Sequence, residues 1–147
     1  MAALLGLSVA GCSTPPTSVF QVSSSTGDAE AAAQLISQYR VARGLSPVRA
    51  DNRLNQAAEF QARAVAEVGE LSHGAFASRM ASFGVGGFSA ENLSAGSRSV
   101  DQAVGRWKAS PRHDENLLLP QATRIGLARA DAPGSRYGRY WALVLAQ

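Results

Sequence analysis

The end of the chain carries the pattern that decides the fold. Residues 125–128 read IGLA and residues 140–145 read YWALVL, two short apolar runs of strand length. Residues 131–135 between them read DAPGS, a cluster of turn-forming residues. The pattern predicts two strands joined as a hairpin.

Helical spacing of apolar residues dominates the sequence before this hairpin. Asp28 is suited to cap a first helix that ends at Gly44, and Asp51 is suited to cap a second helix. The apolar face of the second helix is made of small residues, which allow close packing against a sheet or another helix. A shorter helix is predicted over residues 76–83 and a strand over residues 88–93.

A fourth helix is predicted to begin after Ser99, and Pro111 is predicted to interrupt it just before His113. Trp107 and Trp141 are predicted to lie in the core, where each indole N–H needs a hydrogen-bond partner. The order of elements predicts an α+β fold, in which about four helices flank a small, mostly antiparallel sheet.

Composition limits the classes of protein that fit this chain. Its 147 residues are enough for one domain with a core, and 46% hydrophobic with 17% charged residues excludes a disordered chain. The net charge is +3, and the arginines are scattered rather than clustered. We therefore predict no nucleic-acid partner, and the absence of phosphate-binding motifs predicts no organic cofactor.

The N-terminus reads as a targeting segment. Residues 1–12 form a short apolar run that ends in VAGC, which resembles the lipobox of bacterial lipoproteins, although no Lys or Arg precedes the run. The resemblance implies a membrane partner through a lipid on Cys12. Residues 13–27 are rich in Ser, Thr and Pro and are predicted to form a flexible tether, so the domain is predicted over residues 28–147. We expect an exported protein, either an envelope lipoprotein facing the periplasm or an extracellular one.

Three side chains in separate polar segments are the candidate site residues: His73, Glu91 and His113. Two imidazoles and a carboxylate suit a metal site or an acid–base site. Simpler roles are open as well: His73 can cap helix carbonyls, and Glu91 can accept backbone N–H bonds.

Three neighbouring residues are predicted to support a cleft rather than to react. Ser72 adjoins the first histidine, while Asn92 and Asn116 are better suited to fix loops by hydrogen bonds than to catalysis. Nucleophilic catalysis has little support, because no Gly-x-Ser-x-Gly elbow is present.

Taken in order, the segments resemble the CAP superfamily: the cysteine-rich secretory proteins, antigen 5 and plant pathogenesis-related proteins, also called SCP-domain proteins. The resemblance spans residues 33–144 and is closest to the disulfide-free bacterial branch. The matching fragments are Ile36-Ser37-Gln38-Tyr39-Arg40, Asp51-Asn52-Arg53-Leu54, Ser72-His73, Glu91-Asn92, Trp107 with Ser110-Pro111, His113 with Asn116-Leu117-Leu118, Thr123-Arg124-Ile125-Gly126 and Tyr140-Trp141.

The resemblance implies a three-layer α-β-α sandwich with a central cleft lined by His73, Glu91 and His113. In some members such a cleft binds zinc or another divalent cation, which agrees with the chemistry of these ligands. Animal and plant members have a second glutamate before the second histidine. Here residues 108–112 contain no acid, so the expected site is a triad.

Three functions fit these observations. The first is a binding module that holds a divalent cation and an extracellular small molecule, lipid or peptide. The second is a metal-dependent hydrolase with His73 and His113 as ligands and Glu91 as ligand or general base. The third is a structural envelope module without a ligand. We expect the binding module rather than an enzyme.

Overall fold

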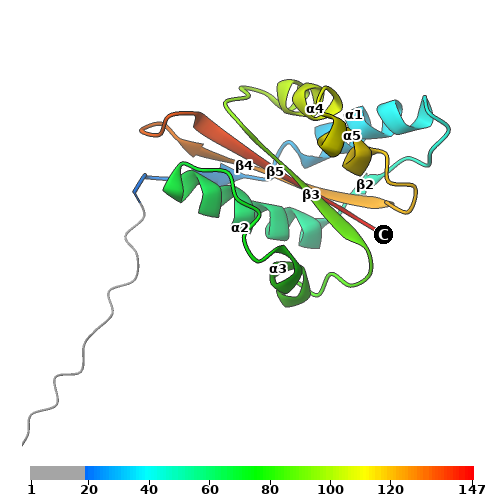
Figure 1. Ribbon diagram of the computed structural model, residues 1–147, viewed down its shortest axis with the longest axis horizontal. Coiled ribbons are helices and arrows are strands. Elements are labelled where there is room, and N and C mark those ends of the chain that lie inside the picture. The colour runs from blue at the N-terminus through cyan, green and yellow to red at the C-terminus, as the bar shows by residue number, and fades with distance from the viewer. Residues whose placement is uncertain (1–18) are drawn as a thin grey trace, which may run out of the picture.

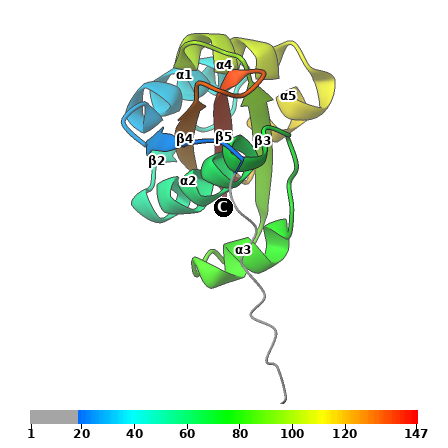
Figure 2. The same cartoon turned by 90° about the vertical axis from the view of Figure 1, so that its left-hand side faces the viewer.

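The computed structural model describes residues 19–147 and forms three layers: helices, a sheet and helices again (Figure 1 and Figure 2). The elements of these residues, in chain order, are β1 Ser23–Ser25, α1 Ala29–Val41, β2 Arg49–Ala50, α2 Asn52–Val68, α3 Phe76–Ser82, β3 Ser89–Ala95, α4 Val100–Lys108, α5 Pro111–Leu117, β4 Arg124–Ala132 and β5 Gly138–Ala146. The predicted α+β sandwich is confirmed.

The predicted hairpin is the centre of the sheet. Strands β4 and β5 pair antiparallel along their whole length, and β3 pairs antiparallel with the other side of β5. The outer side of β4 pairs with the short strands β1, antiparallel, and β2, parallel. The sheet is therefore mostly antiparallel, and β3 is one of its edges.

Alternation along β5 divides the core in two. Tyr140, Ala142 and Val144 face α2, whereas Trp141 and Leu143 face the layer of α1, α4 and α5. Because successive strand residues point to opposite faces, one apolar run supplies both cores. Figure 2 shows the result, with α2 and α3 on one side of the strands and α1, α4 and α5 on the other.

The small residues of α2 pack closely against the sheet, as predicted. A Cβ built on Gly126 would lie 2.0 Å from the backbone carbon of Leu54, so a side chain at position 126 has no room. Asn55 also accepts a hydrogen bond of 3.0 Å from the backbone N–H of Leu127. Asp51 caps α2 by accepting from the backbone N–H of Arg53 and Leu54, also as predicted.

Two predictions on the helices are corrected. Pro111 does not simply end α4: it occupies the first turn of a further helix, α5, where its missing N–H has no cost, so the described residues contain five helices rather than four. Asp28 precedes α1 but makes no capping bond, because its carboxylate accepts from Arg129 instead.

The predicted tether over residues 13–27 is wrong at its C-terminal end. Ser23–Ser25 form β1, and Ser24 pairs with Ala130 of β4. The strand consists of three serines, so its composition resembles that of a tether. Its backbone groups are satisfied by the edge of β4, and one hydroxyl binds Glu59 of α2. The predicted signal segment and Cys12 lie outside the described residues.

Candidate functional site

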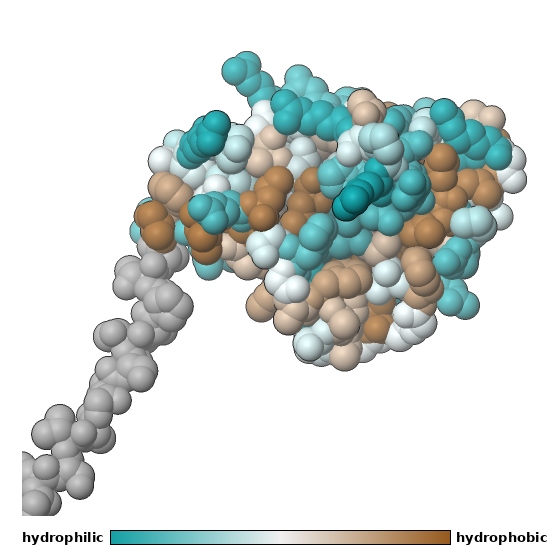
Figure 3. All heavy atoms as spheres, in the orientation of Figure 1, coloured by the Kyte–Doolittle hydropathy of each residue, from teal (hydrophilic) through white to brown (hydrophobic). Residues whose placement is uncertain are grey.

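The two histidines and the glutamate come together at the free edge of β3. They line one cleft of about 670 Å³ together with residues 110–112, Glu115 and Asn116. His73 lies in the segment between α2 and α3, and His113 lies in α5. The two histidines thus approach the sheet edge from opposite layers. Polar residues gather over α5 and the neighbouring part of β3 in Figure 3.

Alternation along β3 explains which partner each side chain meets. Glu91 has the same orientation as Leu93, which belongs to the core beneath α2. Asn92 points to the other side, where its amide donates to the backbone oxygen of His113 at 2.9 Å. One dipeptide therefore supports both walls of the cleft.

The carboxylate of Glu91 is buried and has two side-chain partners. Its side chain is 2% exposed; Oε1 lies 2.9 Å from Nδ1 of His73, and Oε2 accepts from Nη2 of Arg79. A carboxylate only accepts, so Nδ1 of His73 carries a proton in this pair. The alternative considered for Glu91, that it accepts backbone N–H bonds, is not what the structure has: two side chains hold its carboxylate.

Arg79 ties this carboxylate to α2. Its Nη1 donates to Oε1 of Gln61 and to the backbone oxygen of His73 at 3.2 Å, and Gln61 donates to the backbone oxygen of Ser72. These bonds fix the segment that carries His73, and they replace the helix-capping role considered for that residue.

One atom of this network has no partner. Nε of Arg79 is buried without a hydrogen bond, and it is the one such side-chain atom found among residues 19–147. A buried donor left unsatisfied costs roughly 1–3 kcal/mol. Each carboxylate oxygen of Glu91 therefore has a partner, whereas Arg79 has one buried N–H without a partner.

The opposite wall is held by neutral groups. Nδ1 of His113 lies 2.9 Å from the hydroxyl of Ser110, the residue before α5. Asn116 donates to Oδ1 of Asn92 at 2.9 Å and to the backbone oxygen of Glu91 at 3.4 Å. These bonds join β3 to α5 beside the cleft, and the loop-fixing role of the two asparagines stays a prediction.

Burial shifts the protonation of two cleft residues. It raises the pKa of Glu91, while the hydrogen bond from His73 and the charge of Arg79 oppose that rise. Burial also lowers the pKa of His113 below its usual 6.5, with a smaller contribution from the charge of His73. His113 is therefore neutral at neutral pH.

The donor atoms suit a cation bound by imidazoles more than one bound by the whole triad. Within residues 19–147 no group of three His, Cys, Asp or Glu residues is arranged to hold a metal ion. Both Nδ1 atoms are in hydrogen bonds, so the Nε2 atoms of His73 and His113 are the ring nitrogens that could bind a cation. A carboxylate bonded to the far nitrogen of a metal-binding histidine is a frequent second-layer arrangement.

Sequence reasoning missed Arg79, whose guanidinium pairs with Glu91 of the cleft. Arg79 lies in a helix whose other large residues, Phe76 and Met80, are apolar, and the scattered arginines of the sequence indicated only solvated surface charge. An arginine on an apolar helix face near a candidate glutamate is the signal that would have found it. Glu115 also lines the cleft, whereas Asp114 points away and accepts from Tyr39 at 2.6 Å.

The comparison with protein families agrees with this fold. The model of the cysteine-rich secretory protein family, CAP, matches residues 33–145, which is most of the chain. The chain belongs to the CAP family, so the family that the fragments predicted is confirmed.

A curated bacterial protein is similar to the chain in sequence. The chain is similar to the uncharacterized protein YkwD of Bacillus subtilis (strain 168), at 27% identity over 105 residues. This match covers 67% of the chain and 41% of YkwD, so the chain spans less than half of that relative.

Solved structures share the fold at lower identity. An outer surface protein from Borrelia burgdorferi matches with a TM-score of 0.74 and 19% identity, over 88% of this chain and 98% of that one. An extracellular protein containing a SCP domain from Bacillus anthracis str. Ames matches with a TM-score of 0.71 and 20% identity, over 82% of this chain and 40% of that one. At these identities the likeness shows the fold alone.

Proposed function

We propose that the chain is an exported binding module whose cleft holds a divalent cation, zinc being the best match, between Nε2 of His73 and Nε2 of His113. The observation that carries the proposal is the hydrogen bond between Glu91 and Nδ1 of His73, because it occupies that nitrogen and leaves Nε2 as the ring atom that could bind a cation. The lowered pKa of His113 removes competition from protons at the second nitrogen.

Such a cation would have two protein ligands and several open positions. Structural zinc sites have four protein ligands, so we expect weaker binding here and room for oxygen atoms of an extracellular ligand. Glu115 and Asn116 line the same cleft and are placed to contact that ligand.

The binding module agrees better with the cleft than the hydrolase does. A general base must reach a water or substrate proton, whereas the side chain of Glu91 is 2% exposed and bonds to both His73 and Arg79. We therefore assign Glu91 the role of orienting His73.

Calorimetric titration of zinc into the whole chain tests the proposal. Every variant should carry Cys12→Ser, because a free thiol binds zinc on its own. We expect micromolar binding that is lost in His73→Ala and in His113→Ala, and retained in Asp101→Asn, which removes an exposed acid of α4. Equal binding in all variants, or none in any, would reject the cation site and favour a structural module.

Export and membrane attachment are part of the same proposal. Similar folds occur in an outer surface protein and an extracellular protein, and residues 1–12 resemble a lipoprotein signal. Among residues 19–147, no helix has the length and apolar character needed to cross a membrane. Expression in a bacterium fed labelled palmitate should label the chain and not Cys12→Ser; label in neither would reject the lipid anchor.

A further inference from the structure

A second hollow continues the cleft along the free edge of β3. Its volume is about 330 Å³, and it shares Ser110 and His113 with the cleft. The cleft reaches β3 at Glu91, whereas the second hollow reaches it at residues 93–95. We call the cleft and this hollow together the edge groove.

The lining of the second hollow places it beyond the edge of the strand. Successive strand residues point to opposite faces of a sheet, yet Leu93 and Ser94 both line this hollow. Trp107 of α4 lines it from one helical layer, and Leu71, between α2 and α3, lines it from the other. Both layers and both orientations of β3 meet only at the edge that has no partner strand.

Backbone groups of alternate residues point into the groove. In an antiparallel pair, every second residue turns its N–H and C=O away from the partner strand. Gly96, directly after β3, donates to the backbone oxygen of Arg139 at 2.8 Å, and the same register makes the even-numbered residues of β3 face β5. The odd-numbered residues Glu91, Leu93 and Ala95 therefore face the groove.

The carbonyl groups at this edge have partners, but the N–H groups do not. The oxygen of Leu93 accepts from the indole of Trp107 at 3.0 Å, and the oxygen of Ala95 accepts from Arg106 at 3.1 Å. Among residues 19–147, no acceptor is found for the N–H of Leu93 or of Ala95, although these residues are only 5% and 9% exposed. The groove thus offers two donors, spaced by two residues of a strand.

An extended peptide has acceptors at this spacing. Its rise of roughly 3.3 Å per residue repeats the backbone carbonyl on one side every two residues, as on β3 itself. Addition of a peptide strand to an exposed sheet edge is a common mode of recognition, in which main-chain hydrogen bonds supply the affinity.

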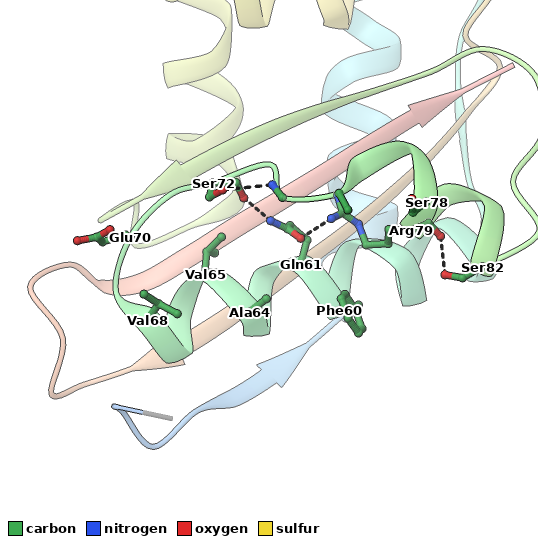
Figure 4. A pocket seen from close by; sticks show the side chains of 12 residues that line it. Phe60, Gln61, Ala64, Val65, Val68, Glu70, Ser72, Ser78, Arg79 and Ser82 are labelled. Atoms are coloured by element: carbon green, nitrogen blue, oxygen red, sulfur yellow. Dashed lines mark hydrogen bonds between the residues drawn. The ribbon is translucent and has the colours of Figure 1, made fainter. Parts of the chain in front are cut away.

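The walls of the groove select a single chain rather than a second copy of the protein. The wall formed by the segment after α2 is held firmly, because Gln61 donates to the backbone oxygen of Ser72 and the hydroxyl of Ser72 accepts from the N–H of Gly74 (Figure 4). The opposite wall is α4 and α5. A second copy has helices on both faces of its own sheet, and these would collide with the two walls.

The side chains at the far end of the groove indicate what such a peptide carries. Leu71 is 46% exposed and Tyr137 is 43% exposed, and both line the second hollow. Arg106 is the one charged side chain of this lining while His113 is neutral, and it has no ion pair within the described residues. An apolar side chain and a carboxylate complement these groups.

We propose that the edge groove binds an extended peptide as an added strand on β3, with peptide carbonyl oxygens on the N–H groups of Leu93 and Ala95. An aliphatic or aromatic side chain of the peptide contacts Leu71 and Tyr137, and a carboxylate pairs with Arg106. The proposal rests on the proposed binding function, because the cleft is one end of the groove, and it names the class of ligand. It does not require the cation.

Selection of a phage-displayed random heptapeptide library on the whole chain tests the site, with Cys12→Ser as background and a chelator present. We expect enriched peptides that combine an apolar residue with Asp or Glu. A labelled synthetic copy, followed by fluorescence anisotropy, should bind roughly tenfold more weakly to Leu71→Ser and to Tyr137→Ser. Val41→Ser changes a residue of α1 that is 56% exposed, and it should bind like the background chain. No enrichment, or equal binding by all variants, would overturn the proposal.

Amide hydrogen exchange followed by NMR tests the mode of binding. Saturating peptide should slow exchange at Leu93 and Ala95 and leave Asn92 and Ser94 unchanged, because the latter two already bond to β5. Unchanged exchange at Leu93 and Ala95 would overturn the added strand. Protection that appears without peptide and grows with protein concentration would overturn it in favour of a second copy. Because the chelator removes any cation, none of these outcomes decides the zinc titration, and the two proposals can fail separately.

Discussion

The two layers that cover the sheet are built on opposite principles. Beneath the sheet, the α2 core is rich in alanine and contains a glycine against which the helix backbone packs. Above it, the core of α1, α4 and α5 contains both tryptophans and most of the large aliphatic side chains. The lower layer is thus sensitive to added volume and the upper layer to lost volume.

The polar groups that hold the two walls of the cleft differ as well. The lower layer buries an ion pair, Arg79 with Glu91, whereas the upper layer fixes its wall of the cleft with neutral amides, Asn92 and Asn116. Buried charge is costly unless fully paired, so damage to the pair of Arg79 and Glu91 should cost more than damage to the asparagine contacts.

Breaking the ion pair should have the largest effect. Glu91→Leu leaves Arg79 as an unpaired buried cation, and we expect a loss of about 3–5 kcal/mol in the free energy of unfolding. Urea denaturation measures it. The double variant with Arg79→Met removes both charges and should recover most of the loss; a double variant less stable than Glu91→Leu would contradict this account of the lower layer.

Adding one carbon beneath the sheet should come next. Gly126→Ala places a Cβ 2.0 Å from the backbone of Leu54. We expect the free energy of unfolding to fall by about 3 kcal/mol, the upper end for an overpacked core. Gly105→Ala is the matched control in α4, because a Cβ there meets nothing within 4 Å.

The control should gain roughly 0.5–1 kcal/mol, since alanine favours a helix over glycine. Thermal unfolding of the two variants gives opposite shifts if the layers differ as described. A gain or no change in Gly126→Ala would show that α2 can move away from the sheet at little cost.

Trimming the upper layer should cost less. The indole N–H of Trp107 donates to the backbone oxygen of Leu93 at 3.0 Å, and that of Trp141 donates to Ser97 at 2.8 Å. Trp107→Phe keeps an aromatic ring but leaves the carbonyl unpaired, for an expected loss of about 1–2 kcal/mol by urea denaturation. A loss as large as that of Glu91→Leu would erase the distinction between the layers.

The sequence predicted the architecture because hydrophobic periodicity and capping residues are local signals. The runs around residues 125–128 and 140–145 fixed the hairpin, and Asp51 fixed the start of α2. Local signals failed for β1, whose serines pair through backbone groups alone with a strand more than a hundred residues away. They also failed at Pro111, which suits a helix start as well as a helix end.

The sequence predicted which residues come together in the cleft, but not the hydrogen bonds that connect them. His73, Glu91 and His113 do line one cleft, yet the side chain that controls Glu91 is Arg79, which no spacing rule linked to it. Its pairing depends on how β3 alternates and on where α3 packs, and both are properties of the assembled fold. The same holds for the edge groove, which needs two walls from separate elements.

The smallest expected effect concerns the pH dependence of the cleft. Burial lowers the pKa of His113 below 6.5, so the folded chain prefers the neutral ring. The stabilisation from this preference is complete above pH 6.5, where the unfolded chain is also neutral, and is lost as the pH falls through the folded-state pKa. A shift of a full pKa unit is worth about 1.4 kcal/mol, and this half-buried ring should contribute less because solvent screens it.

Urea denaturation of wild type and His113→Gln at about pH 7.5 and about pH 5, on either side of the ordinary histidine pKa, should show the stability advantage of the wild type shrinking at the lower pH. An advantage that grows there would mean that the ring is held as a cation, which would also remove the basis for zinc binding at Nε2.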